Sequence, residues 1–382
     1  MKFLKKGLLV LLGIIVLLSV LLFATGNEYL FKGVYATYLH GENSATITDK
    51  SYFDTRTIAS GEVIPWENDI NYNKLPLSDR LENTLEENES ISFLALKDGK
   101  IIQEHYWGDG AKNSKTNSFS MAKSIVSILI GIAIEEGHIE GVFQPVVDFF
   151  PEWDKKNTDN YQLEIIHLLT MSSELDWDES YKSPFSITAK AYYGDDIESL
   201  MLSLNIKDKP GSEFKYLSGN TQLLGLILAR ATGKTLSEYA SEKLWKPLGA
   251  EEDALWHLDK ENDGKELAYC CFNSSARDFA RIGQLYLNKG QWHGKQIVNK
   301  EYTEISTRPS SLASHYGYSW WIATCLGEDV FYARGILGQY IIVVPERNIV
   351  IVRLGHKRGQ AVDMHRDDFY TYVEEIITMY PN

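Results

Sequence analysis

The chain has 382 residues, of which 44% are hydrophobic and 12% aromatic, so it is long and apolar enough for one large domain or two smaller ones. Its formal net charge is −14, and this excludes the strongly basic surface that phosphate contacts need. No basic block occurs after the first six residues. We therefore expect no nucleic-acid partner.

The N-terminus has the pattern of an export or membrane segment. Three lysines in the first six residues precede an apolar run of about sixteen residues, from Leu8 to Phe23. That length lies between the core of a signal peptide and a minimal membrane span. Ala24-Thr25-Gly26 is a poor cleavage site, and no cysteine follows that could carry a lipid. Residues 1–26 are therefore predicted to be an uncleaved membrane anchor, with a cleaved signal as the alternative. In either case, the rest of the chain is exported to the periplasmic or extracellular side.

The following elements are predicted in chain order from apolar periodicity and turn residues. Residues 27–75 are expected to be an irregular lead-in, followed by a domain over 76–382. Its strands are expected at 90–107 (a hairpin turning at Asp98-Gly99), 318–322, 330–333, 340–344 and 349–354. Its helices are expected at 77–87, 118–137, 163–171, 197–204, 220–232, 237–244, 275–287 and 365–380.

This order predicts an α+β fold. The first and last strands should pair in one antiparallel sheet, because neither group alone has enough strands for a stable sheet. A helical lobe of about residues 120–315 is inserted between them. The cleft between sheet and lobe is the expected place for a site.

The most informative stretch is Ser118–Gly137, which is apolar on nearly every side after Ile125 and so predicts a helix buried all round. Ser120 and Lys123 lie one turn apart at its polar end. Helix-terminal amides favour an oxyanion on Ser120, and partial burial should weaken the hold of Lys123 on its proton. A neutral amine beside a hydroxyl is a general base beside a nucleophile.

The structural alternative is a serine that caps the helix and a lysine at the surface. Ser-x-x-Lys also occurs at Ser212 and Lys215, but this copy follows Pro210-Gly211 and precedes an extended stretch, so it lacks a helix N-terminus.

Two further stretches carry candidate residues. Tyr216, Ser218 and Asn220 alternate before a helix and could project together. A phenol near a lysine ammonium is expected to lose its proton more easily and could relay it. Gly335, between two late strands, allows close backbone approach, and an edge N–H there could join that of Ser120 in holding an oxyanion. The alternatives are a core tyrosine with turn or cap residues, and a strand bulge without function.

These motifs together resemble the serine β-lactamase and penicillin-recognising family, particularly its 6-aminohexanoate-dimer hydrolases and the esterases related to class C β-lactamases. The resemblance spans roughly residues 77–380. It rests on Ser120-Met-Ala-Lys123, Tyr216-x-Ser218-x-Asn220 and Gly335-Ile-Leu-Gly-Gln339, supported by Ile166–Ser173, Ser275–Gly283 and Tyr316–Trp321. It implies a β-lactamase-like antiparallel sheet flanked by helices and a large helical lobe.

The resemblance also implies roles. Ser120 would be the acyl-accepting nucleophile, Lys123 its proton acceptor and Tyr216 the proton shuttle. The amides of Ser120 and Ile336 would form the oxyanion hole, and Tyr181 would contact a small amide or ester substrate.

Several positions depart from the family pattern. Ser218 replaces the asparagine of the class C motif, Ala333-Arg334-Gly335 replaces Lys-Thr-Gly, and Glu174 replaces a glycine. Without the lysine that helps to bind the antibiotic carboxylate, efficient β-lactam turnover is not expected.

The remaining side-chain patterns give no other chemistry. The histidines have no metal-ligand spacing, so neither a metal nor another cofactor is predicted. Cys270, Cys271 and Cys325 are interpreted as small buried residues, because adjacent cysteines rarely bridge each other; a bridge to Cys325 remains the alternative.

The alternative to a serine hydrolase is an inactive or slow-turnover, membrane-anchored ligand sensor.

Overall fold

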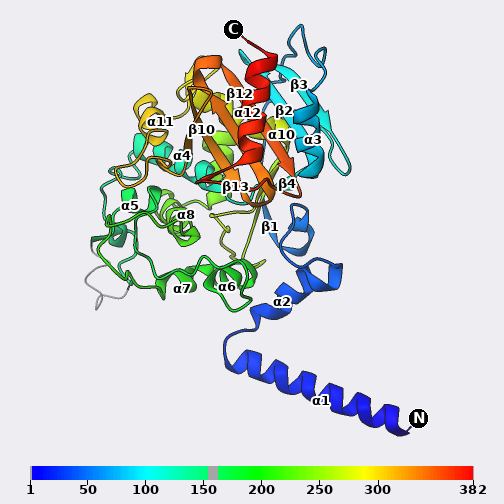
Figure 1. The fold of residues 1–382 in the computed structure, drawn as a ribbon. Helices are drawn as coiled ribbons and strands as arrows, with labels where there is room; N and C mark the ends of the chain where they lie inside the picture. The colour runs from blue at the N-terminus through cyan, green and yellow to red at the C-terminus, as the bar shows by residue number, and fades with distance from the viewer. Residues whose placement is uncertain (1, 154–161, 382) are drawn as a thin grey trace.

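A six-stranded antiparallel sheet forms the centre of the computed structural model, which describes residues 2–153 and 162–381 (Figure 1). Its strand order is β3-β2-β12-β11-β10-β9. The strands are β2 (Ser90–Lys97), β3 (Lys100–Tyr106), β9 (Trp321–Cys325), β10 (Glu328–Gly335), β11 (Gln339–Val344) and β12 (Ile349–Gly355). β2 pairs with β12, with Leu96 opposite Val350. The expected pairing of the first and last strands is therefore confirmed.

The sheet separates two apolar cores because successive side chains of a strand point to opposite faces. On β2, Phe93 contributes to the core beneath α3 (Asp79–Glu87) and α12 (Asp367–Met379). Its neighbour Leu94 contributes to the larger core, which contains α4 (Met121–Glu135) and α10 (Ala276–Leu287). The last helix begins later than expected, since residues 365–366 form a small strand, and β9 lies three residues beyond its expected start.

A helical lobe lies between β3 and β9 in the sequence, as expected. Its helices are α5 (Ile165–Leu169), α6 (Ile187–Tyr193), α7 (Ile197–Leu202), α8 (Ser218–Thr232), α9 (Leu236–Ala240), the π-helix η5 (Ser241–Trp245) and α11 (Lys300–Ser306). Short 3₁₀ turns are η1 (Tyr38–His40), η2 (Asp49–Tyr52), η3 (Val146–Asp148), η6 (Ile336–Gly338) and η7 (Pro345–Arg347). Two small hairpins are β7 (Gln291–Trp292) with β8 (Lys295–Gln296) and β13 (Ala361–Val362) with β14 (His365–Arg366).

The lead-in over 27–75 is more ordered than its composition predicted. It contains α2 (Tyr29–Ala36) and β1 (Thr55–Ile58). β1 begins a second sheet of order β1-β5-β6-β4, whose other strands are β4 (Thr116–Asn117), β5 (Ala254–His257) and β6 (Phe272–Ser274). Strands this short show too little alternation to be recognised in a sequence. The consequence is that the lead-in packs against the helical lobe.

The first helix, α1 (Lys2–Ala24), extends away from the domain, as Figure 1 shows. Its segment Phe3–Ala24 has a mean hydropathy of 3.1 and is long enough to cross a membrane. The apolar side chains along it are exposed. This exposure fits the expected anchor or signal.

Candidate active site

Ser120 immediately precedes α4, as the sequence predicted, but its side chain makes no capping hydrogen bond. Lys123 lies in the first turn of α4 and is buried, with an exposed fraction of 1%. Neither residue fits the structural alternative of a capping serine and a surface lysine. The second Ser-x-x-Lys sequence differs, because Ser212 is exposed and Lys215 forms an ion pair with Glu174.

The amine of Lys123 is held by three neutral oxygens. Its Nζ lies 3.2 Å from Ser120 Oγ, 3.1 Å from Ser218 Oγ and 2.9 Å from the carbonyl oxygen of Tyr269. Burial lowers the pKa of Lys123 to about 8, against a smaller opposing effect of the Glu179 carboxylate. This downward shift confirms the expected direction, since burial disfavours the ammonium form.

Tyr216 also reaches this cluster. Lys123 Nζ lies 5.2 Å from the centre of its ring. The expected ease of losing its proton is wrong. Burial raises the pKa of Tyr216 by more than the nearby Ser120 hydroxyl and the charge of Arg334 lower it. The phenol is therefore protonated at neutral pH.

Gly335 and Ile336 lie where β10 approaches the start of α4. A Cβ added at Gly335 would lie 2.2 Å from the carbonyl oxygen of Ser118, so only glycine permits this approach. Ile336 begins the η6 turn and lines the same cavity as Ser120. The Gln339 amide stabilises the turn by donating to the Ile336 and Leu337 carbonyls at 3.3 and 3.1 Å.

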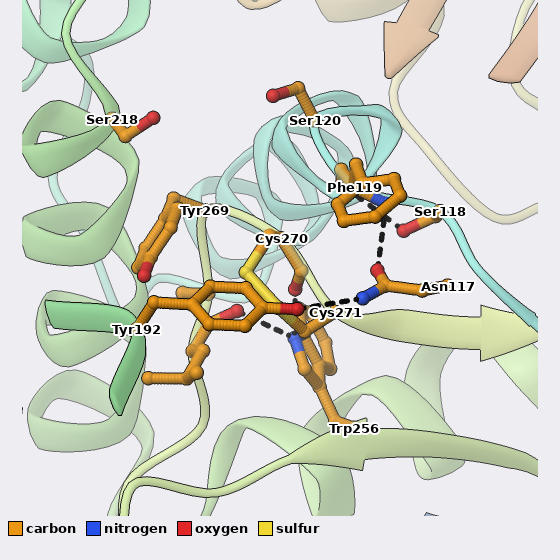
Figure 2. Close-up of a disulfide and its surroundings, with 12 residues drawn as sticks. Asn117, Ser118, Phe119, Ser120, Tyr192, Ser218, Trp256, Tyr269, Cys270 and Cys271 are labelled. Carbon is orange, nitrogen blue, oxygen red and sulfur yellow. Dashed lines mark hydrogen bonds between the residues drawn. A yellow bond between two sulfur atoms is a disulfide. The ribbon is translucent and has the colours of Figure 1, made fainter. Parts of the chain in front are cut away.

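The residue before Ser120 has an unusual backbone conformation. Phe119 has a φ of 46°, a left-handed value that is strained for a bulky side chain and recurs at functional sites. Its N–H donates to Asn117 Oδ1 at 2.8 Å, and the amide of Asn117 donates to Tyr192 Oη (Figure 2). The same amide also donates to Asp49 Oδ1. Burial raises the pKa of Asp49 to about 6. A buried network that reaches into the lead-in therefore supports the turn that precedes Ser120.

Glu179 is a site residue that the sequence did not reveal, because it lies in a loop without periodicity. It accepts from the Ser218 N–H at 2.6 Å and from Ser218 Oγ at 2.7 Å. It also accepts a short hydrogen bond from Tyr181. Glu179 thus positions the same hydroxyl that contacts Lys123. Tyr181 lines the cavity and is exposed to solvent.

Other candidate residues point elsewhere. Asn220 is buried and bonds to Ser173 and Met171 instead of lining the cavity, so the expected projection of Tyr216, Ser218 and Asn220 into one site holds for the first two only. The guanidinium of Arg334 lies 3.6 Å from the centre of the Trp321 ring. Within residues 2–153 and 162–381, no group of three or more His, Cys, Asp or Glu could hold a metal.

The cysteine interpretation needs a correction. Cys270 and Cys271 form a disulfide with each other (Figure 2). Cys325 is free and buried. The alternative bridge to Cys325 is wrong, because the vicinal pair lies in the core containing α4 and Cys325 in the core on the other face of the sheet. The pair directly follows Tyr269, whose carbonyl accepts from Lys123. Cys270 also lines the cavity.

A cavity of about 240 Å³ opens beside Ser120. Its walls come from the start of α4, the loop around Tyr181, α6 and the N-terminal helix α2. The site was expected in the cleft between the sheet and the helical lobe. This description is incomplete, because the lead-in forms one wall of the cavity. The nucleophile candidate lies in a partly enclosed pocket of a size suited to a small organic group.

Comparisons with known proteins decide the family. The family model described as Beta-lactamase matches residues 79–373. This chain belongs to the beta-lactamase family. A 6-aminohexanoate-dimer hydrolase from Paenarthrobacter ureafaciens is 28% identical over 299 residues, covering 72% of this chain and 74% of the relative.

Solved structures confirm the β-lactamase-like fold. A Bacillus anthracis protein assigned as a 6-aminohexanoate-dimer hydrolase superposes with a TM-score of 0.75 at 23% identity, covering 87% of this chain and 92% of the other. A D-stereospecific amidohydrolase from Streptomyces gives a TM-score of 0.61 at 14% identity, covering 79% and 99%. The predicted resemblance and the prediction of a β-lactamase-related hydrolase are both confirmed.

The disulfide leads to a direct prediction. We expect the oxidised protein, unfolded without reductant, to take up one iodoacetamide, on Cys325. After reduction it should take up three, because only the vicinal bridge protects the other thiols. Mass spectrometry of tryptic peptides measures both values. Alkylation of Cys270 before reduction would contradict the bridge, and Cys325→Ser is the control that should reduce the first value to zero.

Proposed function

We propose that this β-lactamase-family serine hydrolase cleaves a small amide or ester through an acyl-enzyme on Ser120, with Lys123 as the base. One observation carries the proposal: the buried amine of Lys123 lies 3.2 Å from Ser120 Oγ, and its hydrogen-bond partners are all neutral. A buried amine without a directly paired carboxylate exists as the free base at a lower pH than an exposed one. It is then able to accept the serine proton.

In acylation, Ser120 Oγ attacks the substrate carbonyl carbon as its proton passes to Lys123 Nζ. The carbonyl π bond opens, and its oxygen becomes the oxyanion of a tetrahedral intermediate. The N–H groups of Ser120 and Ile336 are assigned to this oxygen, because preorganised backbone donors stabilise charge that develops in the transition state. The close approach of Gly335 to Ser118 supports this assignment.

Collapse of the intermediate requires a proton on the leaving amine or alcohol. Tyr216 suits this step because its phenol is protonated and its ring lies beside Lys123. It donates to the leaving group and is reprotonated through the Lys123 ammonium. Water then attacks the acyl carbon and loses its proton to Lys123. When this second tetrahedral intermediate collapses, its bond to Ser120 Oγ breaks, Ser120 takes the proton back from Lys123, and the acid is released. Ser218 keeps the lysine in place, and Tyr181 is assigned to substrate contact.

The N-terminal segment is assigned the role of a membrane anchor. We propose that α1 anchors the protein in the cytoplasmic membrane and that residues 76–382 form the hydrolase domain outside it. The match of the family model to residues 79–373 supports the domain assignment. The exposed apolar surface of α1 supports the anchor.

We expect a fluorophosphonate probe to label the protein and to fail on Ser120→Ala. Lys123→Ala should slow labelling by about 10²- to 10⁴-fold, the usual contribution of a general base. Gel fluorescence and peptide mass spectrometry provide the measurement. The matched controls are Ser212→Ala and Lys215→Ala in the second Ser-x-x-Lys copy, which should label like the parent. Equal labelling of Ser120→Ala would refute the nucleophile assignment, and an acyl adduct from labelled penicillin that never turns over would favour the sensor.

The pH dependence provides a separate test. kcat/KM should rise through a pKa near 8 as Lys123 loses its proton, and level off above it. Glu179→Gln should move this limb to lower pH, because its negative charge raises the pKa of Lys123. Asp178→Asn, which neutralises the adjacent exposed carboxylate, should leave the limb in place. An unmoved limb in Glu179→Gln would show that another group is titrating.

A further inference from the structure

The cavity beside Ser120 has mainly apolar walls. Three hydroxyl groups in its lining already have hydrogen-bond partners within the protein: Thr37 donates to the Gly33 carbonyl, Thr188 to that of Asp178, and Tyr192 to Asp49. The walls therefore favour a ligand that needs few hydrogen bonds.

Charge in the lining is also sparse. Among the described residues that line the cavity, Lys182 is the sole one with a charged side chain, and it is exposed. Tyr269 Oη is buried without a hydrogen-bond partner in the described structure, and Lys123 Nζ lies 5.6 Å from its ring centre. A buried hydroxyl without a partner is thus carried by the ring that flanks Lys123. A substrate with a charged group far from the scissile bond would lose the hydration of that group on entering the cavity and would meet no buried counter-charge.

The wall made by α2 places the cavity close to the membrane. Residues 25–28 separate α1 from α2, so α2 begins less than about 20 Å from the end of α1 even with this link fully extended. Tyr29 donates to the Pro184 carbonyl at 3.0 Å, which joins α2 to the loop on the other side of the cavity.

Around this wall lies a group of exposed apolar side chains, here called the mouth patch: Phe31, Val34, Tyr35, Tyr38, Leu39, Tyr181 and Phe185. Aromatic and aliphatic side chains in such a cluster suit the boundary between water and lipid. Three of its members, Val34, Tyr38 and Tyr181, line the cavity. A lipid surface held beside it by α1 is the occupant that the chain connectivity favours.

We propose that the substrate is an amphiphile of the membrane surface whose uncharged acyl chain enters this cavity, with its ester or amide carbonyl at Ser120. The inference rests on the proposed function of Ser120 and adds the substrate class. The chain would lie against α2 and α6 and leave water on entry. Each methylene so buried is worth up to about 0.8 kcal/mol, or about fourfold in kcat/KM.

The test uses the full chain in phosphatidylcholine vesicles, with vesicles lacking protein as the blank. Hexanoyl p-nitroanilide and 6-aminohexanoyl p-nitroanilide differ at the chain end by a terminal ammonium group. We expect kcat/KM to be at least about tenfold higher for the uncharged member. p-Nitrophenyl octanoate should likewise exceed the acetate by about tenfold or more, in line with methylene burial.

A variant locates the effect. Val34→Trp, on the cavity wall, should reduce the octanoate-to-acetate ratio about fivefold or more, by occupying part of the cavity. Val63→Trp is the matched control, since Val34 and Val63 have exposed fractions of 44% and 47% and Val63 lies outside the lining. Thermal unfolding of both variants verifies that each is folded.

The outcomes separate the two proposals. A preference for the 6-aminohexanoyl substrate, or a ratio unaffected by Val34→Trp, overturns the acyl-chain inference while Ser120-dependent hydrolysis keeps the proposed function. If Ser120→Ala hydrolyses like the parent, the proposed function fails instead. In that case, calorimetry on Ser120→Ala tests the acyl-chain inference without hydrolysis, by comparing the binding of octanamide and 6-aminohexanamide. Tighter binding of octanamide supports the inference, and equal or weaker binding overturns it.

Discussion

The arrangement of the site depends on the removal of one amine from water. An ammonium group transferred into a protein interior costs several kcal/mol even after relaxation, so Lys123 is tolerated there because it gains three hydrogen bonds and can lose its proton. The apolar body of α4 imposes this position, since the helix is buried on all sides and leaves its first turn no route to the surface. The reactivity proposed for Ser120 is thus a consequence of packing.

The elements that meet at this amine come from distant parts of the chain. α4 brings Ser120 and Lys123, the start of α8 brings Ser218, and the end of β10 reaches them because Gly335 has no side chain to obstruct the approach. Glu179 then links Ser218 to Tyr181. This carboxylate acts on Lys123 through one hydroxyl, close enough to raise its pKa yet without forming a direct ion pair. Such an intermediate distance keeps the amine from being fixed as an ammonium ion.

Much of this arrangement could be predicted from the sequence where local patterns are long. The all-round apolar character of Ser118–Gly137 identified α4, and alternation with turn residues identified the central sheet. The second sheet escaped detection because its strands are two to four residues long. The role of Glu179 and the Cys270–Cys271 bridge were not predicted, because each depends on a loop conformation that leaves no periodic pattern in the sequence. The pKa of Tyr216 was expected to be low but is raised, because the phenol is buried by rings that are distant in sequence, including that of Trp321.

The N-terminal segment connects these observations. Asp49, in the lead-in, bonds to Asn117 and so contributes to the strained turn at Phe119 that precedes Ser120. Earlier in the lead-in, α2 forms a wall of the cavity. The same segment continues into α1, so the support of Ser120, a wall of the cavity and the proposed membrane anchor are continuous in sequence. In the proposed anchored state, a substrate that resides in the membrane would meet the cavity where the chain leaves the lipid, and this continuity would place it beside Ser120.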